Sequence, residues 1–255
     1  MKRVFIHMFL YSLEETIQLA KKYNIGAELS LNTEKLLYIK ENDINEISQK
    51  CVGISGLSIH GPFRDLFPGS SDPDIREVAL DRYIETLMVA KALNAEWVVF
   101  HLNYYSQMYG TERLRKTWLL NAIDTFSRIA ELKIKVHIEN THENDPEIFF
   151  DLLKYINEKN FWMCLDVGHA HAYSNKDLEH WIELLSPYIR EVHIHESPRG
   201  EDKHMVLGSG YINVNSVLNL IEERTEGDFV ITLEPVTVED LETNLNWLRE
   251  NGWIR

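Results

Sequence analysis

Short apolar runs rich in β-branched and aromatic residues alternate with amphipathic stretches along the chain. From Asp74 to Leu93, apolar residues recur at spacings of three and four, which predicts a helix with one buried face. The run from Trp97 to Phe100 is apolar throughout, as expected of a strand that is covered on both faces. Eight strands are expected, at Val4–Met8, Ala27–Leu31, Gly56–His60, Trp97–Leu102, Lys135–Asn140, Phe161–Asp166, Glu191–His195 and Val230–Glu234.

Each expected strand is followed by a helical stretch, and this order favours a parallel sheet with crossover helices. Ser12 and Glu15 have the spacing of a capping box at the start of the first helix, and Pro146 fits an early turn of the fifth. Only the second unit is unclear, because the pattern of Glu34–Lys50 is patchy. An open doubly wound sheet is the alternative, but no glycine-rich phosphate loop follows the first strand. We therefore expect an α/β fold in which residues 1–255 form a single (β/α)8 barrel domain.

Length and composition agree with this fold. A chain of 255 residues suits one such barrel, and 44% apolar with 26% charged residues is ordinary for a globular protein. No apolar run is long enough to span a membrane. The apolar start contains His7 and lacks a cleavage site, so we interpret it as the first strand rather than a signal peptide. Cys51 and Cys164 show no disulfide pattern, and a reducing, cytoplasmic location is expected.

The net charge of −14, with His neutral, disfavours a broad basic surface for nucleic acid, because such affinity comes largely from neutralising phosphates. It leaves room for a local basic patch, and cations bound by clustered carboxylates would offset part of it. A small-molecule substrate is therefore expected, without a membrane partner. The oligomeric state is open: Tyr104, Tyr105 and Tyr109, after the fourth strand, suit a substrate pocket, a contact in a homo-oligomer, or a solvated loop.

Residues that commonly bind divalent metal stand at the ends of six consecutive expected strands, from the third to the eighth. The ends of parallel barrel strands converge on one mouth, where the active sites of this fold lie. His, Asp and Glu suit borderline and hard cations such as Zn²⁺ and Mn²⁺, whereas the paired Cys ligands of a structural zinc site are absent. The candidates are His60, His101, Glu139, Asp166, His169, His193, Asp202, His204 and Glu234.

A lone His at a strand end is more often a hydrogen-bonded polar residue than a metal ligand. His137 and His171 alternate with better candidates and are expected to point elsewhere, while His195 is ambiguous because it shares a face with His193. The candidates stand at six consecutive strand ends, and unrelated polar residues would not follow the strand ends in this way. No pattern indicates a role for three further histidines, His7, His142 and His180.

With these residues placed, the chain resembles the xylose-isomerase-like barrel superfamily from about Ser58 to the last strand. That superfamily joins sugar and sugar-phosphate isomerases and epimerases with endonuclease IV, an apurinic-site phosphodiesterase. The motifs that carry the resemblance include Ile59-His60-Gly61-Pro62-Phe63, His137-Ile138-Glu139-Asn140, Asp166-Val167-Gly168-His169 and Asp202-Lys203-His204. The endonuclease pattern implies three cation sites: His60, His101 and Glu139; then Glu139, Asp166, His193 and Glu234; then His169, Asp202 and His204.

The isomerase pattern implies only the second of these sites. Glu139 and Glu234 would then act as the base and acid that move a proton next to a carbonyl group. The same pattern implies a substrate-binding Arg six residues after the His of the seventh strand, where Arg199 stands. Arg64 and His169 are further candidates for substrate binding.

The chain departs from both patterns. The loop 61–70 lacks the Tyr and the Asn-Leu pair with which the endonuclease enters DNA, and His195-Glu196 replaces an Asn-Asp pair. These changes weaken the endonuclease interpretation. Asp202 and His204, in turn, are more than a one-metal isomerase requires.

Three functions are therefore compared. The first is isomerisation or epimerisation of a sugar or sugar phosphate, with one divalent cation stabilising an enediolate. The second is hydrolysis of a phosphodiester, in abasic-site DNA or a small molecule, with two or three cations. The third is a barrel without catalysis, which is disfavoured because so many ligand-type groups near one mouth are costly without a cation. Net acidity and the altered loop favour the first, with one to three ions of Zn²⁺ or Mn²⁺ as cofactor.

Overall fold

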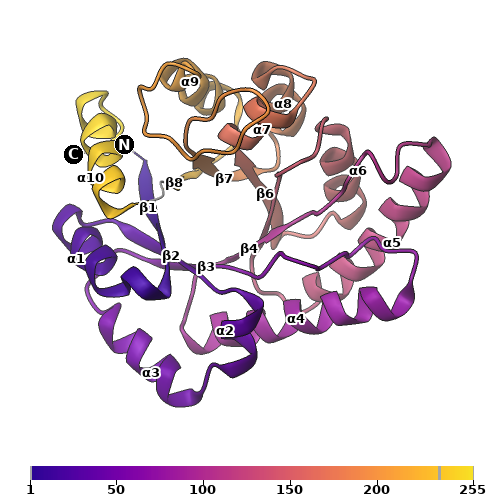
Figure 1. Ribbon diagram of the computed structural model, residues 1–255, viewed down its shortest axis with the longest axis horizontal. Helices are drawn as coiled ribbons and strands as arrows, with labels where there is room; N and C mark the ends of the chain where they lie inside the picture. Colours follow the sequence, from indigo (N-terminus) through magenta and orange to yellow (C-terminus); the bar gives the residue numbers. More distant parts are fainter. Residues whose placement is uncertain (1, 235–236, 255) are drawn as a thin grey trace.

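Eight parallel strands form a closed barrel in chain order in the computed structural model, which describes residues 2–234 and 237–254 (Figure 1). β1 pairs with β2 on one side and with β8 on the other, which closes the ring. This order confirms the predicted barrel and excludes the open sheet. The strands are β1 (Arg3–Met8), β2 (Gly26–Ser30), β3 (Leu57–His60), β4 (Val98–His101), β5 (Val136–Glu139), β6 (Phe161–Asp166), β7 (Ile189–Ile194) and β8 (Val230–Leu233).

Helices surround the ring of strands in Figure 1 and cover its outer face. The longer helices bury apolar residues against the barrel, as α5 (Glu112–Ala130) does with Trp118 and Phe126. Burying a large apolar side chain stabilises the fold by about 1.5–3 kcal/mol. The helices are α1 (Leu13–Tyr23), α2 (Thr33–Tyr38), α3 (Glu41–Lys50), α4 (Pro73–Ala92), α5 (Glu112–Ala130), α6 (Glu147–Ile156), α7 (Val167–Tyr173), α8 (Leu178–Leu185), α9 (Val214–Arg224) and α10 (Val238–Glu250), with a 3₁₀ turn, η1, at Leu10–Ser12.

The strand register brings the predicted ligand residues to one level of the barrel. His101 of β4 pairs with Glu139 of β5, and Asp166 of β6 pairs with His193 of β7. Because parallel strands keep their carboxyl ends at one edge, these residues face the same mouth.

One local prediction needs correction, and the stretch that the sequence left unclear is resolved. Ser12 precedes α1, but η1 holds it outside the extended conformation of a helix cap, and its hydroxyl donates to the Phe9 carbonyl instead. The predicted capping box is therefore wrong. The patchy stretch Glu34–Lys50 is two short helices, α2 and α3, each with one buried apolar residue.

Other predictions agree with the structure. Pro146 immediately precedes α6, and Cys51 and Cys164 are both free thiols. Lys2 N–H donates to the Trp253 carbonyl, so the start of β1 and the segment after α10 lie side by side. Within the described residues, no helix is both long and apolar enough to cross a membrane.

Candidate metal centre at the barrel mouth

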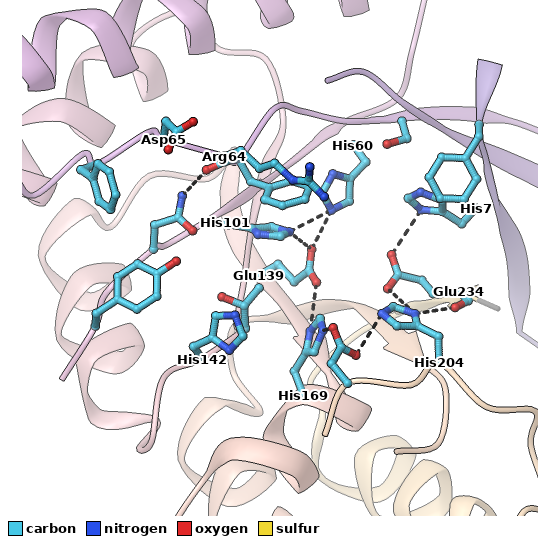
Figure 2. A pocket seen from close by; sticks show the side chains of 18 of the residues that line it. His7, His60, Arg64, Asp65, His101, Glu139, His142, His169, His204 and Glu234 are labelled. Atoms are coloured by element: carbon cyan, nitrogen blue, oxygen red, sulfur yellow. Dashed lines mark hydrogen bonds and ion pairs between the residues drawn. The ribbon is translucent and has the colours of Figure 1, made fainter. Parts of the chain in front are cut away.

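A cavity of about 590 Å³ opens at the carboxyl ends of the strands (Figure 2). His60, His101 and Glu139 line one part of it, and His204 and Glu234 line another. These side chains come from β3, β4 and β5, from the loop after β7, and from the residue after β8. The mouth of the barrel is therefore a concave site built by residues far apart in the sequence.

His60, His101 and Glu139 form the first group of potential ligands, and all three are buried. One carboxylate oxygen, Glu139 Oε2, lies 3.0 Å from His60 Nε2 and 3.2 Å from His101 Nε2. The two Nε2 atoms are 3.1 Å apart. Phe63 stacks on the His101 ring and covers its other side.

The second group contains Glu139, Asp166, His193 and Glu234, again all buried. His193 Nδ1 lies 3.0 Å from Glu234 Oε1 and 3.6 Å from Glu139 Oε2. Asp166 also caps α7, where its side chain accepts the His169 N–H at 2.6 Å. The helix start thus fixes Asp166 and His169 relative to each other, and Glu139 belongs to both this group and the first.

The third group contains His169, Asp202 and His204, and it includes a residue that the sequence left ambiguous, His195. Asp202 lies 3.3 Å from His169 Nε2 and 3.1 Å from His204 Nε2. The His195 ring stacks on His204, with ring centroids 3.8 Å apart. His204 has φ +45°, a conformation that costs a non-glycine residue about 1–2 kcal/mol and often occurs at functional sites.

The orientation of three histidines suits metal binding. Nδ1 of His60, of His169 and of His204 bonds a backbone carbonyl, at 3.0, 3.2 and 2.6 Å. A carbonyl only accepts, so Nδ1 carries a proton, and Nε2 is the nitrogen left to bind a metal. Metal-binding histidines commonly hold their second nitrogen in this way. In each case the free Nε2 faces a carboxylate within 3.3 Å.

Buried polar atoms in the site lack partners, which also fits a cation. Asp166 Oδ2, His195 Nε2 and both ring nitrogens of His193 have no hydrogen-bond partner among the described residues. A buried polar group without a partner costs about 1–3 kcal/mol. The nitrogen and oxygen donors of the three groups suit Zn²⁺ or Mn²⁺. The residues therefore fit divalent cations, as the sequence predicted.

The charges in the site shift its pKa values strongly. Burial raises the pKa of Glu139, but the charges of His101 and His193 lower it more, so it lies well below its usual range. The pKa of Glu234 also lies well below its usual range, because the charge of His193 lowers it more than burial raises it. Burial lowers the pKa of His101, although the nearby Glu139 carboxylate opposes this shift.

The predicted substrate-binding residues lie in different places. Arg64 is exposed at the edge of the cavity and lines it, and His169 lines it from α7. Arg199 is exposed and donates to the Ser174 carbonyl, and it is not among the residues that line the cavity. Of the three loop tyrosines, Tyr105 lines the cavity, while Tyr104 is buried against Trp118.

The other histidines are also placed by the structure. Neither His137 nor His171 lines the cavity, in agreement with the prediction, and His137 Nδ1 bonds Glu191 at 2.7 Å. His180 pairs with Glu147 on the surface. His7 and His142, to which no role was given, both line the cavity.

The buried carboxylates that escaped the sequence analysis include Glu28, Glu143 and Glu191. Glu28 of β2 lies 3.3 Å from His193 Nε2, and Glu143 accepts hydrogen bonds from Tyr104 N–H and Thr141 N–H. Glu28 stands in mid-strand and Glu143 in a loop, so neither shared the strand-end position that identified the others. The sequence held one sign that polar side chains enter the barrel from the first strand, namely His7. Its Nδ1 lies 3.2 Å from Glu234 Oε1.

The fold and the mouth together define a (β/α)8 barrel with converging histidine and carboxylate groups. The family described as xylose isomerase-like TIM barrel matches residues 17–251, and the chain belongs to this family.

Individual relatives differ in what their names say. An uncharacterized protein of Methanocaldococcus jannaschii is 28% identical over 205 residues, 76% of this chain and 69% of that protein. A probable endonuclease 4 of Aquifex aeolicus is 24% identical over 217 residues, 76% of each chain. Among solved structures, a D-tagatose 3-epimerase-like protein superposes with a TM-score of 0.80 at 24% identity and covers 98% of this chain and 96% of that chain. At this identity the solved structure supports the fold alone.

Proposed function

We propose that this chain is an enzyme that uses divalent cations, Zn²⁺ or Mn²⁺, to hydrolyse a small phosphodiester. The supporting observation is that three of the five groups of potential ligands among the described residues together contain all nine predicted ligands and adjoin one another at the mouth. Glu139 joins the first group to the second, and His204, bonded to the Glu234 carbonyl, joins the third to the second. Proton transfer next to a carbonyl needs only the second group, whereas phosphoryl chemistry commonly uses several adjoining cations.

The residues of such a site would have different roles. When bound, the cations would supply a water of lowered pKa and neutralise charge on the phosphoryl oxygens. The backbone carbonyls hold His60, His169 and His204 with Nε2 toward the site. Arg64, a permanently charged forked donor at the edge of the cavity, suits a phosphate oxygen of the substrate. Phe63 shields the first group from solvent by stacking on His101.

The charge of the molecule favours a small substrate over duplex DNA. Apart from histidines, Arg64 is the one basic residue among the described side chains that line the cavity, and the net charge is −14. DNA binding requires several cationic side chains along the phosphate backbone. A small phosphodiester needs only one such contact besides the cations.

Isomerisation or epimerisation of a sugar or sugar phosphate is the second candidate. Glu139 and Glu234 both belong to the second group and both line the cavity, where a carboxylate on each side of a substrate carbon would serve as base and acid. Membership of the family described as xylose isomerase-like also supports it. Against it, Arg199 does not line the cavity, and the third group has no part in the reaction.

The test combines metal content with turnover. After loading with Zn²⁺ or Mn²⁺ and exhaustive dialysis, elemental analysis should find about three ions per chain, and the enzyme should cleave a chromogenic phosphodiester. His204→Ala should lose about one ion and lower the rate by about a hundredfold, because a bound cation contributes several kcal/mol of charge stabilisation. His180→Ala, a surface histidine outside the site, is the matched control and should change neither.

The second candidate predicts a different result. About one ion per chain, no cleavage of the diester, and exchange of a substrate proton with solvent in a sugar panel would replace the proposal by an isomerase. In that case Glu234→Gln should abolish exchange, while His204→Ala should leave it intact. A protein that retains no ion would contradict both candidates.

A further inference from the structure

Among the five candidate histidine ligands, His193 is held differently from His60, His169 and His204. His60, His169 and His204 each place Nδ1 against a backbone carbonyl. His193 is fully buried in mid-barrel and turns Nδ1 toward the second group, 3.0 Å from Glu234 Oε1. Its second nitrogen, Nε2, makes no hydrogen bond to a carbonyl or any other described group. Some other acceptor must therefore fix this ring.

Two buried carboxylates lie within reach of His193 Nε2. Glu28 Oε1 is at 3.3 Å and Glu191 Oε1 is at 3.5 Å. Both side chains are fully buried. The choice between them depends on which oxygen is still free to accept a hydrogen bond.

Glu191 is already satisfied. Its Oε1 accepts the Thr232 hydroxyl at 2.7 Å, and its Oε2 lies 2.7 Å from His137 Nδ1. Glu28 accepts the Ser58 hydroxyl with Oε2 only, at 3.1 Å. Its Oε1 has no hydrogen-bond partner among the described residues and faces His193 and, at 3.7 Å, His7. The free acceptor therefore belongs to Glu28.

We propose that Glu28 is the positioning residue of His193: when a cation occupies the second ligand group, Glu28 Oε1, 3.3 Å away, accepts the Nε2–H of this ring, and the Nδ1 lone pair is directed into that group. Glu28 does not line the cavity, so it acts on the site through His193 and not by touching substrate. Ser58 of β3 holds Glu28 in turn, which connects the second group to the side of the barrel opposite its own strands. The inference rests on the metal site of the proposed function and not on the reaction.

The test is the affinity of the folded protein for Zn²⁺, measured against a competing chelator. Glu28→Gln keeps the size of the side chain and should lower the affinity for one Zn²⁺ ion by about 10–100-fold. This range is typical when a residue that hydrogen-bonds a metal ligand is replaced. Glu191→Gln is the matched control, since it changes an equally buried carboxylate near the same ring, and its Zn²⁺ affinity should stay at the wild-type value. Equal affinity of Glu28→Gln and wild type, or a loss as large in Glu191→Gln, would overturn the inference.

A second measurement needs no variant and covers a Glu28→Gln protein that does not fold. In ¹⁵N NMR of the Zn²⁺-loaded wild type, the His193 proton should be attached to Nε2. A proton on Nδ1 would refute the role of Glu28 while leaving metal binding intact. A wild type that binds no Zn²⁺ would remove both this inference and the proposed function, so the two failures are distinguishable.

Discussion

At the scale of single residues, Glu143 shows how burial sets a charge next to the mouth. Its side chain is 1% exposed, and its two oxygens accept the N–H groups of Tyr104 and Thr141, at 3.0 and 2.7 Å. These bonds tie the loop after β4 to the loop after β5. Burial nevertheless raises the pKa of Glu143 to about 7, because the two backbone donors offset only part of the cost of removing the carboxylate from water.

The raised pKa makes stability depend on pH. Between about pH 4.5, the ordinary value, and pH 7, the folded state holds this proton more tightly than the unfolded state, so ionisation lowers the free energy of unfolding as pH rises. Glu143→Gln removes the titratable group. It also replaces one hydrogen-bond acceptor by an NH₂ group, and the stability lost in this way does not depend on pH. Relative to wild type, the variant should therefore gain up to about 3 kcal/mol across this window, at about 1.4 kcal/mol per pKa unit.

Urea unfolding at a series of pH values, with a chelator present throughout, measures this difference. The same substitution at Glu131, an exposed position on the outer surface, is the control and should show no such trend. A difference between Glu143→Gln and wild type that does not change with pH would refute the prediction.

The sequence predicted which residues meet at the mouth better than it predicted what holds them. The nine candidate ligands were recognisable because they follow strand ends and because they fit a family pattern, and the structure brings them into three groups. Their metal binding remains a prediction. Glu28 and Ser58 could not be found in this way, because their contact joins mid-strand positions of β2 and β3 and depends on the barrel interior. The position of Arg199 depends on a loop conformation that spacing does not specify.

At the scale of elements, the ends of β5 and β6 are joined by one side chain. Asn140 Nδ2 donates to the Asp166 carbonyl, and Asn140 Oδ1 accepts the Asp166 N–H, both at 2.9 Å. The Asn140 carbonyl also accepts a hydrogen bond from His169 Nδ1. The side chain therefore fixes the two strand ends that present Glu139 and Asp166 to the second ligand group.

Replacement of Asn140 should uncouple these ends. Asn140→Ala leaves two buried backbone groups of Asp166 without partners and should lower the free energy of unfolding by about 2 kcal/mol or more. It should also weaken Zn²⁺ binding, because Asp166 loses its orientation.

A similar asparagine at the opposite end of the barrel provides the control. Asn160 is also buried and donates to the Ala130 and Ile134 carbonyls, just before the starts of β5 and β6, whose other ends carry the ligands. Asn160→Ala should cost comparable stability in urea unfolding and leave Zn²⁺ affinity unchanged. If both variants lose Zn²⁺ equally, the effect of Asn140 is one of global stability and the prediction is wrong.

Element boundaries were predictable to the extent that periodicity was strong. β6 has the bounds expected from the sequence, and α4 differs by one residue at each end. The second unit was not predictable, because α2 and α3 bury only Leu36 and Ile47, too few apolar positions to show a period. Short amphipathic helices of this kind depend on packing against the barrel more than on their own pattern.

At the scale of the whole molecule, the acidic charge and the mouth are connected. Six carboxylates gather in and around the candidate ligand groups of the described residues, in a chain whose net charge is −14: Glu28, Glu139, Asp166, Glu191, Asp202 and Glu234. Closure of the barrel forces them together, because each comes from a different strand or loop of the ring. The cost of that assembly falls when cations occupy the site, so binding of cations and stability of the fold are linked.

Removal of metal should therefore lower the melting temperature. For one site at a hundred times its dissociation constant, binding to the native state adds about 2.7 kcal/mol, which corresponds to about 5–10 °C for a domain of this size. Differential scanning calorimetry of the Zn²⁺-loaded and the chelator-treated protein measures the shift. His193→Ala should reduce it, since His193 belongs to the second group, whereas His180→Ala should retain it in full. Identical melting temperatures with and without Zn²⁺ would show that the gathered carboxylates are stabilised by their histidine partners alone.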